Sequence, residues 1–158
     1  MSDTANLPMI ERRRIEATIL KHVYETLKAS LGDEIARRTI AESVRRSSIE
    51  QGQQMATEVG GKTSLETFAG IMPRWSQDDA ITMEMKASTD TKLEFDITRC
   101  RYSEMYKEMG LGEIGHLLSC QRDGTFCEGY DPRLKLTRTQ TIMQGASHCD
   151  FKYRYEGE

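Results

Sequence analysis

The segment that most constrains the fold is residues 133–155, in which apolar and polar side chains alternate with a period of two. Such alternation is typical of a strand that buries one face. It predicts two strands joined by a turn at residues 144–147. Arg138 falls on the apolar face of the first strand, and Cys149 falls on the aromatic face of the second. A buried guanidinium without a partner is costly, so the pattern predicts a pocket that supplies one.

Two long helices are expected before this segment. Residues 8–31 and 33–59 carry apolar side chains at helical spacing, Gly32 interrupts them, and Asp33 can cap the second. The residues expected on their apolar sides are Ile15, Ile19, Val23, Leu27, Ile35, Ala36, Ile40, Val44 and Met55. Amphipathic helices of this length must cover something, which is each other, the sheet or a second subunit.

Shorter helices are expected around the strands. Thr63 and Glu66 fit a capping box, and Ser103 is expected to cap a helix that runs through Met109. Residues 113–120 suit another helical segment with its apolar side chains inward.

A second hairpin completes the expected fold. Residues 81–86 and 93–98 alternate with a period of two, and the turn between them lies in residues 87–91. The fold class is therefore α+β, with N-terminal helices packed on a four-stranded antiparallel sheet and short helices between the two hairpins.

The length of 158 residues predicts a single domain over residues 1–158. Residues 1–7 are expected to be disordered and residues 8–73 to be helical. Residues 80–158 are expected to form the sheet and the short helices that carry the site.

Composition narrows the classes of function. Hydrophobic residues make up 37% of the chain, charged residues 30%, and the net charge is −3. These values indicate a soluble globular protein and argue against nucleic acid as a partner. The basic run at residues 12–14 is interpreted as the solvent-facing side of a helix. No apolar segment approaches the roughly 20 residues of a membrane span, so no membrane partner and a cytoplasmic location are expected.

Cysteine usage fits that location. The four cysteines are expected to be reduced in the cytoplasm, and they form no CxxC pair that would indicate zinc. No metal or cofactor is expected. A metal site remains an alternative because folding can bring separated ligands together, and its candidate ligands are Cys100, Cys120, His148 and Cys149.

Reactive side chains are dense in residues 99–123. Glu104 is either a site residue or the partner of Arg101 or Lys107 in a surface ion pair. His116 and Cys120 lie four residues apart and would share one side of a helix, either as an activated thiolate pair or as ordinary neighbours.

Cys149 is the stronger candidate for a nucleophile. The adjacent His148 points to the opposite face of a regular strand, so His116 or a carboxylate from residues 99–123 is the expected partner. Arg138 on an apolar stripe is expected to pair with Asp123, with Glu104 or with a substrate carboxylate.

Three long motifs carry a family resemblance. They are CRYSEMYKEMG at residues 100–110, LGEIGHLLSCQRDGTFCEGYDP at residues 111–132 and LTRTQTIMQGASHCDFKYR at residues 136–154. Together they resemble the L-2-amino-thiazoline-4-carboxylic acid hydrolase family. The resemblance implies a small cytosolic hydrolase that opens a cyclic C–N or C–S bond of a thiazoline-carboxylate-like ring. It also implies a fold similar to vinyl-reductase-like and transport-particle-like domains, which are often dimeric.

The residues and the resemblance together define the expected site. The catalytic residues are expected to be Cys149, Cys120, His116, Glu104 and His148. The substrate-binding residues are expected to be Arg138, Tyr102, Asp123 and Arg101. The expected partners are a small-molecule substrate and a second copy of the chain. Two other classes of function stay open, a non-enzymatic small-molecule sensor and a structural dimer whose cysteines are only packed.

Overall fold

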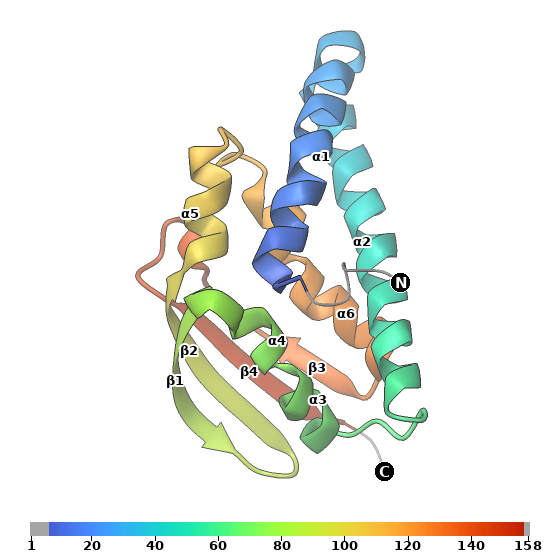
Figure 1. Cartoon of the computed structure of the whole chain (residues 1–158), viewed down its shortest axis with the longest axis vertical. Helices are drawn as coiled ribbons and strands as arrows, with labels where there is room; N and C mark the ends of the chain where they lie inside the picture. Colours follow the sequence, from blue (N-terminus) through green and yellow to red (C-terminus); the bar gives the residue numbers. More distant parts are fainter. Residues whose placement is uncertain (1–6, 157–158) are drawn as a thin grey trace.

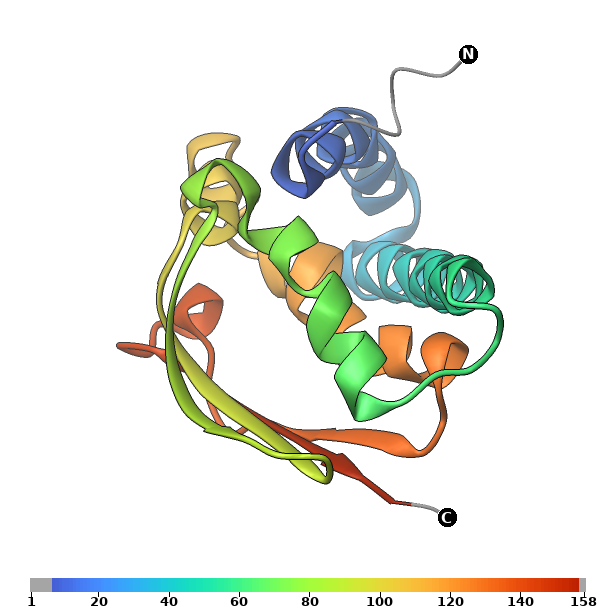
Figure 2. The same ribbon diagram turned by 60° about the horizontal axis from the view of Figure 1, so that its bottom comes forward.

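The structure, a computed structural model, describes residues 7–156 and has a helical layer over one face of a four-stranded sheet (Figures 1 and 2). This α+β architecture is the one predicted. The helical elements are α1 (Met9–Leu31), α2 (Asp33–Glu58), α3 (Leu65–Ile71), α4 (Pro73–Ser76), η2 (Gln77–Asp79), α5 (Arg101–Glu108), η3 (His116–Cys120), α6 (Arg122–Tyr130) and η4 (Ile142–Gln144). The strands are β1 (Ile81–Ser88), β2 (Lys92–Cys100), β3 (Leu134–Thr137) and β4 (Cys149–Tyr155).

The sheet is antiparallel with the strand order β1-β2-β4-β3. Its two central strands bury the residues that the alternation placed inward, because helices cover only one face. Phe95 of β2 pairs with Phe151 of β4, and their rings stack at 5.0 Å. Figure 2 shows the concave side of the sheet turned toward α3, α4 and α6.

The first strand of the last hairpin is shorter than predicted. It ends at Thr137 instead of continuing toward residue 142. The cause is Asp150, whose carboxylate accepts hydrogen bonds from the backbone N–H groups of Thr139 and Gln140 at 2.9 and 3.0 Å. These bonds take the place of a strand ladder, so residues 138–148 form a loop. Arg138 therefore reaches the interior from this loop and not from the face of a strand.

The side of α1 that faces the interior also differs from the prediction. Ile15 and Ile19 are 60% and 62% exposed, whereas Arg13 and Ala17 are buried. The interpretation of residues 12–14 as a solvent-facing run is therefore wrong for Arg13. Arg13 is buried because its guanidinium finds partners there, in Glu16 and in Gln51 of α2. On α2, Ile35 is exposed, and Ala36, Ile40, Val44 and Met55 are buried as predicted.

Two helix starts lie close to the predicted positions but use other caps. Ser64, not Thr63, caps α3 and forms a capping box with Thr67, because the Thr63 hydroxyl donates instead to Asp131 at 2.9 Å. Cys100 caps α5, since its Sγ accepts the backbone N–H of Ser103 at 3.4 Å.

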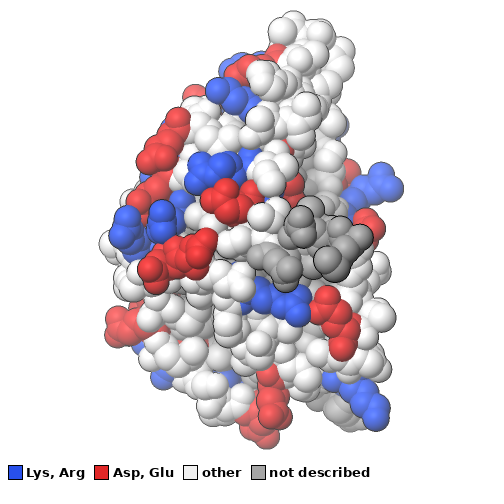
Figure 3. Space-filling view, in the orientation of Figure 1, with Lys and Arg blue, Asp and Glu red and all other residues white. Residues whose placement is uncertain are grey.

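Charged side chains of both signs are interspersed on the face shown in Figure 3. Surface ion pairs such as that of Arg45 with Glu42 occur along the described helices. None of the helices within residues 7–156 is long and apolar enough to cross a membrane. The predicted disorder at residues 1–7 falls almost entirely on residues 1–6, which lie outside the described part of the chain.

Helices α2 and α6 approach each other closely because glycines face the contact. A Cβ atom on Gly129 would lie 2.0 Å from the carbonyl oxygen of Ile49, and one on Gly52 would lie 2.3 Å from that of Phe126. Both obstacles are backbone atoms, which cannot rotate away as a side chain can. This contact holds α6 against α2 in the helical layer that covers the sheet.

Gly129→Ala is therefore expected to destabilise the protein by about 2–3 kcal/mol, because the added methyl group must push two helices apart. Gly124→Ala is the matched control on the same helix, since no atom lies within 4 Å of its Cβ position. The control should be neutral or stabilising by up to about 1 kcal/mol through helix propensity. Thermal unfolding of both variants measures the difference, and equal stabilities would contradict the tight contact.

Candidate functional site

A cavity of about 110 Å³ lies between the concave face of the sheet and the helices. Most of its wall is apolar and aromatic. The aromatic residues that contribute are Phe68, Trp75, Tyr102, Tyr106, Phe95, Phe126, Phe151 and Tyr153. A concave space with aromatic walls and a few polar groups is the usual form of a small-molecule site.

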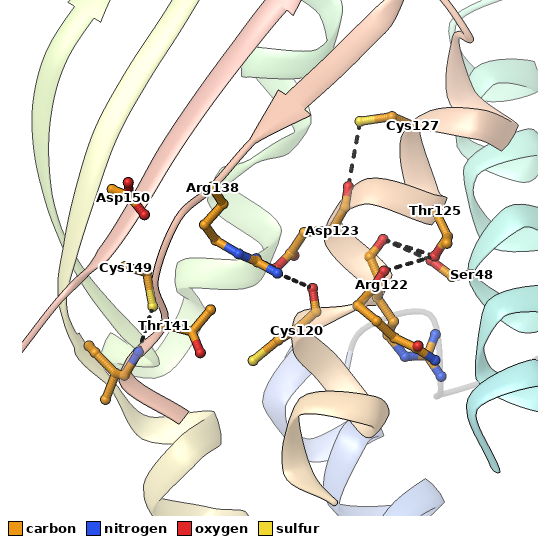
Figure 4. A network of polar contacts seen from close by, with 12 residues as sticks. Ser48, Cys120, Arg122, Asp123, Thr125, Cys127, Arg138, Thr141, Cys149 and Asp150 are labelled. Carbon is orange, nitrogen blue, oxygen red and sulfur yellow. Dashed lines mark hydrogen bonds and ion pairs between the residues drawn. The ribbon is translucent and has the colours of Figure 1, made fainter. Parts of the chain in front are cut away.

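Three cysteines reach this cavity from different elements. Cys100 ends β2, Cys120 ends η3 and Cys149 begins β4. In Figure 4 the Cys120 thiol points from η3 toward the side of the cavity where Thr141 and Cys149 lie. The fourth cysteine, Cys127, is buried, does not line the cavity and donates to the carbonyl oxygen of Asp123 at 3.5 Å.

Burial holds the three cavity cysteines in the thiol form. It raises the pKa of Cys100 to about 11 and also raises the pKa values of Cys120 and Cys149. For Cys120, the nearby carboxylate of Asp123 raises the pKa further. For Cys149, a hydrogen bond from the backbone N–H of Ile142 to Sγ at 3.2 Å acts in the opposite direction. A thiol in this environment needs a base before it can act as a nucleophile.

Asp123 and Arg138 supply a half-buried charge pair beside the thiols. Arg138 Nη1 donates to Asp123 Oδ2 at 2.6 Å, and Nη2 donates to the carbonyl oxygen of Cys120 at 2.9 Å (Figure 4). The guanidinium also stacks over the Phe151 ring, 5.0 Å from its centroid. Burial raises the pKa of Asp123, and Arg138 opposes that shift. A carboxylate with a raised pKa is suited to general acid and base chemistry near neutral pH.

The structure brings several predicted site residues together at this cavity. They are Cys149, Cys120, Arg138, Asp123 and Tyr102. The Tyr102 hydroxyl is occupied, because it donates to the carbonyl oxygen of Trp75 at 2.9 Å. Asp123 is the partner of Arg138, which was one of the alternatives left open by the sequence.

His116 and Glu104 do not line the cavity. Glu104 lies on the surface and pairs with Arg99 at 3.1 Å, not with Arg101 or Lys107. His116 begins a π-helical turn, in which its carbonyl oxygen accepts from the N–H of Gln121. Burial and Arg37 lower the pKa of His116.

His148 and Arg101 also lie outside the cavity lining. His148 Nδ1 contacts the Ser147 hydroxyl at 2.9 Å. Arg101 is exposed and donates to the carbonyl oxygen of Asp78 at 2.8 Å. Within residues 7–156, no three His, Cys, Asp or Glu side chains form a group that could hold a metal ion, so Cys100, Cys120, His148 and Cys149 do not assemble the alternative metal site.

The sequence did not indicate two buried arginines that line the same cavity. Arg13 donates through Nη1 to Glu16 at 3.0 Å and through Nη2 to Gln51 at 3.0 Å. Arg122 shares the same carboxylate, since its Nη2 donates to Glu16 at 3.2 Å. The helical spacing of Arg13, Ala17 and Tyr24, all buried on α1, was the signal that could have placed Arg13 inside.

Comparisons with known proteins now place the fold and the family. In the solved structures, the phenol-responsive sensory domain of the transcription activator PoxR with phenol is similar, with a TM-score of 0.55 and 12% identity over 88% of this chain and 73% of that one. A trafficking protein particle complex subunit 3 from Naegleria fowleri, covalently bound to palmitic acid, is similar with a TM-score of 0.53 and 9% identity over 93% of this chain and 98% of that one. At such identities the likeness concerns the fold alone. No match was found among curated proteins.

The fold and the cavity define an α+β protein with a small, mostly apolar cavity between sheet and helices. The family model described as L-2-amino-thiazoline-4-carboxylic acid hydrolase matches residues 12–153, which is nearly the whole chain. The chain belongs to this family.

The raised pKa values predict how the thiols respond to pH. We expect alkylation of Cys120 and Cys149 by iodoacetamide to accelerate about tenfold for each pH unit between pH 7 and pH 9, because only the thiolate reacts. Peptide-resolved mass spectrometry measures both rates, with the unfolded protein in urea as the reference. A rate that is fast at pH 7 and independent of pH would indicate a preformed thiolate and contradict the expectation.

Proposed function

We propose that this protein is a hydrolase that opens the ring of a thiazoline-carboxylate-like substrate with the help of a cavity cysteine. The observation that carries the proposal is that Cys120 and Cys149 line one small cavity together with Asp123, a half-buried carboxylate with a raised pKa. Membership of the family supports the hydrolase class. The substrate and the bond that is cleaved belong to the proposal.

The first step is attack by the thiol of Cys149 or Cys120 on C2 of the ring. The new S–C2 bond forms while the bond from C2 to the ring sulfur breaks. Asp123 accepts the proton of the attacking thiol and delivers it to the departing ring sulfur, which becomes a free thiol. The product of this step is an isothiourea carried on the enzyme cysteine.

The second step is hydrolysis of that isothiourea. Water adds to the same carbon, the bond to the enzyme sulfur breaks, and the cysteine recovers its proton. The released product carries a carbamoyl group on nitrogen and a free thiol. One water molecule is consumed, and no oxidant or reductant is needed. Alternatively, the cysteine positions a water molecule that Asp123 activates directly for attack on C2.

Arg138 has a positioning role in this scheme. Its guanidinium holds Asp123 Oδ2 and the carbonyl oxygen of Cys120, so it orients the base and the end of η3 together. A thiol mechanism requires reduced cysteines, and we therefore propose that the protein acts in a reducing compartment such as the cytoplasm.

A second candidate function is favoured by the apolar wall of the cavity. A sensor or binding domain would hold a small aromatic ligand among Phe95, Phe126 and Phe151 without turning it over. The structural likeness to a sensory domain that responds to phenol is compatible with this alternative. Ligand binding without turnover, unaffected by loss of the thiols, would favour it over the hydrolase.

The proposed hydrolysis is tested by thiol release from racemic 2-amino-thiazoline-4-carboxylate. The variant that lacks the attacking thiol, Cys149→Ala or Cys120→Ala, should lose at least about 10³-fold in kcat, because a nucleophile acts as part of a unit. Cys127→Ala is the matched control, since Cys127 is buried but does not line the cavity. Full turnover by the double variant without Cys120 and Cys149 would exclude a thiol mechanism. A parallel assay with a chelator tests for a metal requirement.

The pH profile tests the role of Asp123. Activity requires deprotonated Asp123, so its raised pKa sets the acidic limb of kcat/KM, and activity is lost as pH falls through that pKa. Arg138→Gln should move this limb to higher pH, because Arg138 lowers the pKa of Asp123. Asp123→Asn should reduce kcat by about 100-fold or more at every pH. An acidic limb that stays in place in Arg138→Gln would assign the titration to another group.

A further inference from the structure

We infer that Arg13 and Arg122 form an anion subsite in the cavity, which takes the carboxylate group of the ligand. The inference deepens the proposed function and rests on it in one respect, that the cavity receives the substrate. It assigns the carboxylate to two residues that the sequence did not indicate, and it differs from the expectation that Arg138 would hold this group.

The charges around the cavity are unbalanced. Three guanidinium groups line it, those of Arg13, Arg122 and Arg138, against one carboxylate, that of Asp123. Glu16 contacts Arg13 and Arg122 from a position that is 38% exposed, so three positive charges face two negative ones. Arg13 and Arg122 are only 3% and 7% exposed. A buried positive charge without its full complement is costly, and a bound monoanion removes that cost.

Among the described residues, Arg122 has a terminal nitrogen that makes no hydrogen bond, whereas both terminal nitrogens of Arg138 already donate. Arg138 uses Nη1 on Asp123 and Nη2 on the carbonyl oxygen of Cys120. Arg122 uses Nε on the carbonyl oxygen of Leu118 at 3.0 Å and Nη2 on Glu16. Among the described residues Arg122 makes no other hydrogen bond, so its Nη1 keeps both N–H donors for a ligand. A guanidinium is well suited to carboxylate because its donors form a planar fork.

The two arginines also repel each other in the absence of an anion. Burial, and then the charge of Arg13, lower the pKa of Arg122 to about 10. Arg13 and Arg122 share the single carboxylate of Glu16, and a bound anion would lessen their repulsion. The excess of one positive charge fits a monoanion such as a carboxylate better than a dianion such as a phosphate monoester.

The position of the subsite relative to the thiols suits a bifunctional ligand. Asp123 follows Arg122 directly on α6, and Figure 4 shows the Asp123 carboxylate turned toward Arg138 while the Arg122 guanidinium points to the other side of the helix. Tyr106 and Ser119, hydrogen-bonded to each other at 2.7 Å, also line the cavity. The cavity therefore has a guanidinium region and a thiol region, and a small heterocyclic carboxylate offers one group to each.

The test measures binding and does not depend on turnover. The probes are 2-aminothiazole-4-carboxylate and its neutral carboxamide, aromatic rings that the proposed reaction would not open. Calorimetric titration of the wild type is expected to give a preference of at least about tenfold for the carboxylate, which a charged hydrogen bond supplies. Arg122→Met should lose the preference while it retains carboxamide binding. Arg122→Lys, which keeps the charge but not the fork, should recover part of it.

Arg45→Gln is the control for a general loss of positive charge, because Arg45 is on the surface of α2 and does not line the cavity. It should keep the full preference. Arg13→Gln provides a second test of the subsite should Arg122→Met fail to fold, and circular dichroism checks each variant.

Two results would overturn the subsite. One is an unchanged carboxylate preference in both Arg122→Met and Arg13→Gln, and the other is a wild type that shows no preference or binds neither probe. Loss of the preference in Arg138→Gln alone would give the role to Arg138. Failure of the proposed function gives a different result. The wild type would then still prefer the carboxylate probe over the carboxamide but would not open the thiazoline ring.

Discussion

The close contact between α2 and α6 is the constraint on which the site depends. Gly52 and Gly129 allow backbone to meet backbone, with no side chain between the two helices. This approach fixes α6 against α2, and Arg122 and Asp123 in the first turn of α6 line the cavity. Ser48 of α2 reinforces the contact, because its hydroxyl donates to the carbonyl oxygen of Arg122 at 3.0 Å. A larger residue at either glycine would push α6 away from α2 and so displace Arg122 and Asp123 from their places in the cavity wall.

The site combines groups that are unfavourable when buried alone. Thiols in an apolar cavity stay protonated, and the carboxylate and guanidinium groups lose the solvation they would have in water. In this site the charged groups offset one another's cost of burial. Arg138 opposes the upward shift in the pKa of Asp123, and the carboxylate of Glu16 accepts hydrogen bonds from both Arg13 and Arg122. The three guanidinium groups have only two carboxylates between them. This excess of positive charge is the basis of the proposed preference of the cavity for an anionic ligand that also carries an apolar ring.

The same architecture serves different purposes in its structural relatives. One similar structure is a sensory domain with phenol and another is a subunit covalently bound to palmitic acid. The fold therefore does not decide between binding and catalysis, and function must be argued from the side chains that line the cavity. In this chain those side chains include three thiols and an ion pair, which is the reason for preferring the hydrolase over a binding domain.

The sequence by itself determined the α+β class, the two long helices and the inward faces of β2 and β4. These features follow from local periodicity and from chain breaks at glycine, which act over a few residues. Only the tertiary structure decided which side of α1 is buried, where β3 ends and which charged groups meet. Arg13 illustrates the reason: its buried guanidinium donates to Gln51 of α2, a residue distant in sequence that only folding brings near. His116 and Glu104 illustrate the converse, because nearness in sequence to reactive residues did not bring them to the cavity.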